Sequence, residues 1–167
     1  MIQDLNEFGL EELIHELRKG SGIRRAESAV RLGKLRDKRA VKPLIEALSD
    51  PNMAVRNNVA YALGELGASE AVPLLIATLQ DPEDWVRKSA AKALGMLRSK
   101  EAVAPLRRAL KDQSEMVRRS AVRSLSQVGG AEAMEAILSI SPKDSAVAKM
   151  AEQAIERLKA GKTRDNS

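Results

Sequence analysis

An aspartate followed six residues later by an arginine is the first spacing in this sequence that could do chemistry. In SDPNMAVRNNVAYALGELG, Asp50 precedes a predicted helix and Arg56 lies one turn inside it. Such a pair could clamp a ligand or take part in catalysis, because a guanidinium group binds carboxylates strongly. The spacing returns twice, as Asp81 and Arg87 and then as Asp112 and Arg118. Since a catalytic site is usually unique, the recurrence favours a structural role.

Other residue types that support catalysis or metal binding are scarce. The 167 residues include no cysteine and one histidine, His15, which excludes disulfides, thiolate metal sites, histidine-based triads and multi-histidine metal sites. The sequence also lacks a recognisable nucleophile–base pair and a phosphate-binding loop. We therefore predict no catalytic residue, no metal and no cofactor, and we expect a protein that is not an enzyme.

The whole chain is built on a repeat of 31 residues, and this repeat must position the Asp and Arg side chains. Leucines recur at this interval at Leu32, Leu63, Leu94 and Leu125. A second ladder comprises Leu44, Leu75, Leu106 and Ile137. Within each unit, apolar residues at helical spacing predict two helices separated by a short turn. Neither helix could bury its apolar face alone, so neighbouring pairs must stack.

The expected organisation is one domain over residues 1–160, with a flexible tail at 161–167. Capping helices are predicted at about 9–19 and 147–159, the first of them aligned with the second helix of a unit. Four full repeats are expected between the caps, at about 23–53, 54–84, 85–115 and 116–146. Aromatic residues make up only 2% of the chain, so the core must be aliphatic.

These residues resemble the HEAT-repeat family, in the short form called phycobilisome-lyase HEAT-like repeats. The shared pattern, DPxxxVRxxxAxALGxLGxxxAVxxLxxAL, is nearly complete in Asp50–Leu79 and again in Asp81–Leu110. The resemblance covers residues 10–159 and implies an all-α, right-handed solenoid whose second helices line a concave face. It also implies binding of a protein partner. Some relatives attach or detach bilins, others are hydroxylases built on His-Glu pairs, and a divergent branch comprises DNA glycosylases.

Within such a stack, the recurring polar and glycine positions have structural interpretations. Each aspartate can accept hydrogen bonds from backbone N–H groups at a helix start, and each arginine can bond carboxylates or turn carbonyls of neighbouring units. Gly33, Gly64 and Gly95 interrupt the first helices at one phase, which indicates close approach of a neighbouring helix. His15-Glu16 is interpreted as a solvated pair.

Charge alternates along the chain rather than being spread evenly. The net charge is +5, with +8 in residues 18–42, −6 in 43–86 and +8 in 87–123. Such banding favours an acidic or mixed-charge partner. We expect contacts at second-helix positions where the units differ: Lys38, Arg39, Lys42, Glu70, Pro73, Lys100, Arg107, Arg108 and Lys111.

Three of the variable residues could have either a structural or a binding role. Arg107 replaces an apolar residue of the other units, which suggests function, although an arginine whose stem covers apolar surface is the preferred interpretation. Trp85 is expected to pack in the turn between units, with a binding role as the alternative. Tyr61 is predicted near the surface of a first helix.

The favoured function is a non-enzymatic scaffold that binds a protein on its concave face. One alternative is a bilin lyase or an accessory factor for a chromophore-carrying protein. Another alternative is nucleic-acid binding. The pI of about 9.6 favours it, whereas the scarcity of aromatic residues that could stack on bases disfavours it. The chain has neither a signal-peptide pattern nor a long apolar run, so we expect a cytoplasmic, monomeric scaffold without membrane contact.

Overall fold

The computed structural model describes residues 2–140 and 145–164, and this part of the chain is helical, without strands. The first helices of the units are α2 (Gly22–Leu35), α4 (Met53–Glu65), α6 (Asp84–Met96), α8 (Glu115–Val128) and α10 (Ser145–Arg164). The shorter second helices are α3 (Val41–Glu46), α5 (Val72–Thr78), α7 (Val103–Ala109) and α9 (Gly130–Leu138). Helix α1 (Ile2–Lys19) precedes them. The predicted all-α solenoid of stacked helix pairs is confirmed.

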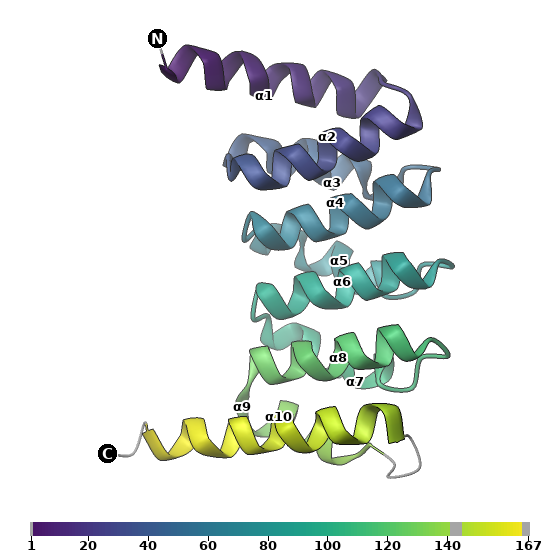
Figure 1. Cartoon of the computed structure of the whole chain (residues 1–167), viewed down its shortest axis with the longest axis vertical. Helices are drawn as coiled ribbons and strands as arrows, with labels where there is room; N and C mark the ends of the chain where they lie inside the picture. Colours follow the sequence, from purple (N-terminus) through teal and green to yellow (C-terminus); the bar gives the residue numbers. More distant parts are fainter. Residues whose placement is uncertain (1, 141–144, 165–167) are drawn as a thin grey trace.

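The helices form two rows, which Figure 1 shows one behind the other. The first helices lie side by side in the front row, and α3, α5, α7 and α9 lie behind them. Helices α1 and α10 cover opposite ends of the stack. Two differences from the sequence-based boundaries concern these end helices: α1 begins at Ile2 rather than near residue 9, and α10 continues to Arg164. Residues 161–164, predicted as tail, therefore belong to the last helix.

The aliphatic ladders form the core. Leu32, Leu63, Leu94 and Leu125 are all fully buried, and so are their second-helix counterparts. The first helices pack closely because of the glycines on their neighbouring faces. A Cβ added at Gly64 would lie 2.8 Å from the Cα of Ala93, and one added at Gly33 would lie 2.9 Å from the Cβ of Ala62. The predicted packing role of these glycines is confirmed.

The first helices α2, α4, α6 and α8 are each followed by a residue with positive φ. These residues lie 31 apart and are Arg36 (φ 54°), Gly67 (φ 62°), Arg98 (φ 49°) and Gly129 (φ 72°). A left-handed residue lets the chain reverse at the end of a helix. Glycine adopts this conformation without strain, whereas the Cβ of an arginine costs about 1 kcal/mol there. The positive φ at this position is thus set by the repeat rather than by the residue type, although the turn at Gly129 differs, since its ψ is −169° and Gly130 also has a positive φ.

Candidate partner-binding surface

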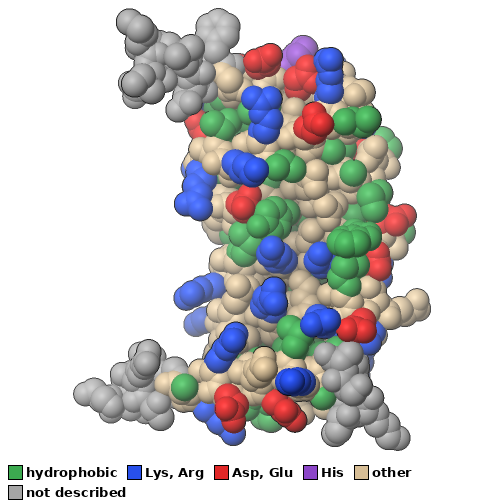
Figure 2. Space-filling view, viewed as in Figure 1, with side chains coloured by type: hydrophobic (Ala, Val, Ile, Leu, Met, Phe, Trp, Pro, Cys, Tyr) green, Lys and Arg blue, Asp and Glu red, His purple; other side chains and the backbone are tan. Residues whose placement is uncertain are grey.

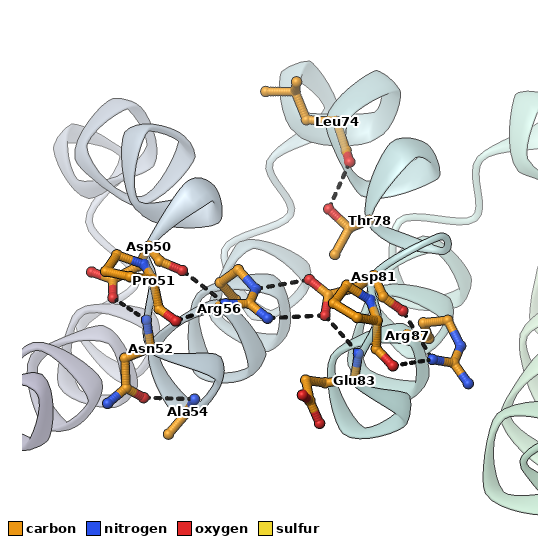
Figure 3. Close-up of polar contacts among 11 residues, drawn as sticks. Asp50, Pro51, Asn52, Ala54, Arg56, Leu74, Thr78, Asp81, Glu83 and Arg87 are labelled. Atoms are coloured by element: carbon orange, nitrogen blue, oxygen red, sulfur yellow. Dashed lines mark hydrogen bonds and ion pairs between the residues drawn. The ribbon is translucent and has the colours of Figure 1, made fainter.

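The recurring arginines connect neighbouring units of the stack. Arg56 donates through Nε and Nη2 to the two carboxylate oxygens of Asp81, at 2.8 and 3.0 Å. Its Nη1 donates to the backbone carbonyl oxygens of Asp50 and Pro51, at 2.9 and 3.2 Å. Figure 3 shows this arginine spanning the two turns. Asp50 and Arg56 are therefore not partners through their side chains, since the carboxylate that Arg56 binds lies 25 residues further on.

The same geometry occurs at three joints. Arg25 binds Asp50 at 2.7 and 2.9 Å, and Arg87 binds Asp112 at 2.8 and 2.9 Å. Arg118 donates to the carbonyl oxygens of its own turn, at Asp112 and Gln113. The next position of the aspartate series, residue 143, lies outside the described residues. We call the three Arg–Asp pairs the ion-pair ladder.

The carboxylates of the ladder also fold their own turns. Asp50 accepts a hydrogen bond from the backbone N–H of Asn52 at 2.8 Å, and Asp81 accepts one from Glu83 at 2.9 Å. The residue that caps α4 is Asn52, whose side chain accepts from Ala54 N–H at 2.9 Å. The aspartate thus stands two residues before the cap, and its carboxylate holds the turn that leads into the helix.

Burial and hydrogen bonding act in opposite directions on the aspartates. Burial raises the pKa of Asp81, but the hydrogen bonds from Arg56 and from the Glu83 N–H outweigh it, so the pKa lies below its usual value. The pKa values of Asp50 and Asp112 are lowered for the same reasons. These carboxylates are ionised and engaged near neutral pH, which makes them poor general bases and poor ligand contacts.

An open groove lies between the second helices α5 and α7. It has a volume of about 730 Å³, and its lining includes Gln80, Pro105, Arg108 and Lys111. Asp81, Arg87 and Asp112 of the ion-pair ladder also line it. Arg108 and Lys111 are exposed, and within the described residues neither side chain forms an ion pair or a hydrogen bond. The groove therefore offers two cations above a floor whose own charges are paired.

A smaller groove of about 400 Å³ lies between α1 and α3 and is lined by equivalent positions of the repeat, which we call the same frame. Its eight lining residues, among them Arg25, Pro43 and Asp50, correspond to residues of the α5/α7 groove 62 positions later. The difference lies at the rim, where Arg18 and Glu46 form an ion pair of 3.1 Å across the groove. Gln80 and Arg108 take their places in the α5/α7 groove. The alignment of α1 with a second helix holds in space as well.

Of the other predicted contact residues, three have partners within the chain. Lys38 donates to the carbonyl oxygens of Leu66 and Gly67, at 2.6 and 3.2 Å. A cation at these carbonyls stabilises the end of α4, so Lys38 is a capping residue rather than an open contact. Arg39 pairs with Asp37 at 2.8 Å, and the exposed Arg107 approaches Glu135 at 3.7 Å.

The remaining predicted contacts lie exposed along the second-helix row. They are Lys42, Glu70, Pro73 and Lys100. Lys100 occupies the same position as Lys38 two repeats later. Within the described residues, however, its side chain makes no hydrogen bond to a helix end. The structure thus separates the predicted set into residues that stabilise the fold and residues that are available to a partner.

The first helices also carry two lysines, Lys88 and Lys92, that were not among the predicted contacts. The Lys88 ammonium group lies 4.5 Å from the centre of the Trp85 ring, and that of Lys92 lies 4.4 Å from the centre of the Tyr61 ring. Trp85 is 50% exposed. The expectation that Trp85 packs in the turn between units is therefore wrong, because its side chain lies on the surface beneath a lysine.

Neither a metal centre nor a membrane span is found in the described part of the chain. No group of three His, Cys, Asp or Glu side chains in residues 2–140 and 145–164 could hold a metal ion. His15 is exposed, and Glu16 beside it pairs with Arg24 at 3.3 Å. The helices searched include none that is long and apolar enough to cross a membrane.

Comparison with known proteins agrees with this architecture. The chain is 30% identical to a chain in the complex of CpcE and CpcF of phycocyanin lyase from Nostoc sp. PCC7120, with a TM-score of 0.76. The alignment covers 89% of this chain and 64% of that one, so this chain spans less than two thirds of its relative's length. No curated protein sequence matches.

Designed repeat proteins share the fold at lower identity. A designed armadillo repeat protein in complex with the peptide (KR)4 is 23% identical, with a TM-score of 0.70 and coverage of 94% of this chain and 85% of that one. An engineered protein is 21% identical, with a TM-score of 0.67 and coverage of 89% and 78%. A family model described as HEAT repeats matches residues 10–95 and 72–156. The chain belongs to the HEAT-repeat family.

Proposed function

We propose that this solenoid is a non-enzymatic scaffold that binds an acidic segment of a partner protein in the α5/α7 groove. The observation that carries the proposal is the pair of cations, Arg108 and Lys111, at the rim of a groove whose floor is already neutralised by the ion-pair ladder. A carboxylate entering this groove would meet positive charge without displacing an internal partner.

The fold and the relatives support a protein partner in general. A HEAT solenoid presents extended surfaces to other proteins, and the similar Nostoc structure is a complex of two proteins. Charge complementarity at the rim would speed association and select acidic over basic segments. Lys42 and Lys100 add positive charge elsewhere in the second-helix row.

The proposal is tested with a fluorescein-labelled peptide of alternating glutamate and alanine, titrated against the full chain by fluorescence anisotropy. We expect the double variant Arg108→Glu/Lys111→Glu to weaken binding at least tenfold. The matched control is Arg18→Glu/Glu46→Arg, which exchanges the ion pair of the α1/α3 groove and should leave affinity unchanged. Equal affinity for both variants and the unaltered chain would overturn the proposal.

A second candidate function is that of a bilin lyase component or accessory factor. It is favoured by the 30% identity to a chain of the phycocyanin lyase complex. Arginine and lysine at the α5/α7 groove could pair with the propionate groups of a bilin. Mixing the protein with a free bilin and recording its absorbance spectrum tests this candidate, since binding in a protein groove shifts the absorption bands.

A further inference from the structure

We propose that the first helices form a second binding surface, for a protein segment that is apolar at one end and acidic at the other. One column of residues crosses this surface at intervals of 31: Val30 on α2, Tyr61 on α4, Lys92 on α6 and Arg123 on α8. Its chemistry changes in one direction, from aliphatic through aromatic to basic. Such a gradient along a stack of equivalent positions provides an orientation for a ligand.

The apolar end of this surface is an exposed groove between α2 and α4. Ile23 is 73% exposed and Val30 is 37% exposed. Both line a groove of about 490 Å³, together with Ala26 and Ala54. Isolated exposed aliphatic residues are ordinary, but two that share a groove with alanines form a site that can bury an apolar side chain.

The basic end lies on α6 and α8. Lys88 and Lys92 are positioned over the rings of Trp85 and Tyr61, at 4.5 and 4.4 Å, and Arg123 is exposed. In the described part of the chain none of these three cations forms an ion pair with a carboxylate. Figure 2 shows Lys and Arg side chains gathered over the middle of these helices. Because the rings already hold both lysines, a carboxylate would bind with a smaller loss of side-chain entropy.

The acidic residues on this side favour a protein segment over a nucleic acid. Glu27 and Arg31 both line the apolar groove, so its charges balance, and Glu65 follows Tyr61 by one helical turn. A phosphate backbone that crossed from α8 to α2 would pass Glu65 and reach a groove without net positive charge, whereas a segment with apolar residues at that end would not be repelled. The aliphatic side chains of this groove, Ile23 and Val30, offer no charge to a phosphate backbone.

The length of the segment follows from the geometry of the stack. Packed helices lie about 8–10 Å apart, so the three steps from α2 to α8 span roughly 25–30 Å. An extended chain advances about 3.3 Å per residue, which corresponds to a segment of about eight or nine residues. Two apolar residues at one end and three glutamates at the other would reach both parts of the surface.

The test uses a labelled peptide of two leucines, four alternating glycines and serines, and three glutamates, titrated against the full chain. We expect Lys92→Glu/Arg123→Glu to weaken binding about tenfold or more, and Ile23→Ser to weaken it several-fold. A peptide lacking either end should bind as weakly as the corresponding variant. Circular dichroism would establish that each variant remains helical.

The titrations are repeated in the Arg108→Glu/Lys111→Glu background, which removes the cations of the α5/α7 groove, and there the effects of Lys92→Glu/Arg123→Glu and of Ile23→Ser should persist. The matched control is Arg18→Glu/Glu46→Arg, which exchanges an ion pair between α1 and α3 and should leave the affinity for this peptide unchanged. Equal affinity of Lys92→Glu/Arg123→Glu and the unaltered chain would overturn the proposal. So would tighter binding of a short DNA duplex than of the peptide at the same salt concentration, since it would identify the basic end as a nucleic-acid site.

Discussion

The α1/α3 and α5/α7 grooves are built from the same positions of the repeat, yet their charges differ. Both have a proline wall and a floor formed by a ladder arginine and its aspartate. Across the first groove, Arg18 and Glu46 neutralise one another at 3.1 Å. In the second, Gln80 faces Arg108, and Lys111 stands where the first has Ser49. The comparison shows that the repeat provides the shape and a few exchangeable rim residues decide the binding chemistry.

Disrupting the Arg–Asp pair in the floor of the α5/α7 groove should have the largest effect on stability. Arg87→Ala deletes the pair with Asp112 and two hydrogen bonds to turn carbonyls. The pair is partly buried, with 16% and 12% of the two side chains exposed. We expect a loss of about 2–3 kcal/mol in the free energy of unfolding, between the values for exposed and buried pairs. Urea denaturation measures it, and Lys42→Ala, an exposed residue, should change stability by less than about 0.5 kcal/mol.

Acid should weaken the floor of both grooves in the same pH range. Because the pKa values of Asp50, Asp81 and Asp112 are lowered in the folded state, their contribution is complete above the usual aspartate pKa of about 4. It is lost as pH falls below that value and through the folded-state pKa. Asp112→Asn should be less stable at pH 7 and should lose less stability on acidification. A parallel pH dependence for this variant would show that Asp112 does not contribute in this way.

Exchanging the rims should exchange the binding behaviour of the two grooves. The triple variant Gln80→Arg/Arg108→Glu/Lys111→Ser gives the α5/α7 groove the rim residues of the α1/α3 groove. We expect it to bind the glutamate–alanine peptide about tenfold more weakly, about 1.4 kcal/mol, with little change in stability. The reciprocal variant Arg18→Gln/Ser49→Lys/Glu46→Arg should gain binding at the α1/α3 groove. A reciprocal variant that gains nothing would show that the rim charges are not sufficient.

The smallest predicted effect concerns the turns at the ends of the first helices, which recur in every unit. Arg98 has a positive φ of 49° where the preceding unit has Gly67. Arg98→Gly should raise the free energy of unfolding by about 0.5–1 kcal/mol, because glycine removes the steric cost. Thermal unfolding measures the gain. Gly67→Arg is the reverse test and should destabilise the protein by a similar amount.

Much of the fold could be predicted from the period of the sequence. Ladders such as Leu32 to Leu125 place buried residues at constant phase, and the phase of Gly33, Gly64 and Gly95 predicted the close approach of first helices. The partner of each arginine could not be assigned, because an aspartate lies both 6 residues before Arg56 and 25 residues after it. Only the distance between successive turns decides which carboxylate it reaches.

The candidate site was less predictable because side chains of equal charge have different surroundings. Lys38 and Lys100 share a position in the repeat, but only Lys38 caps a helix end. Trp85 shares a column with the buried Val147, and this column led to the expectation of packing. Ile23 of the same column is 73% exposed, so the burial of Val147 in the last helix, α10, does not extend to the earlier units.

The most direct test of the central claim is an NMR titration of the full chain with the glutamate–alanine peptide. Backbone and arginine side-chain resonances report on both grooves in a single experiment. We predict that chemical-shift changes concentrate on Arg108, Lys111 and the surrounding residues of α5 and α7, while those of Arg18 and Glu46 stay unchanged. Equal changes in both grooves, or changes confined to α1 and α3, would contradict the claim that rim charge distinguishes two grooves of the same frame.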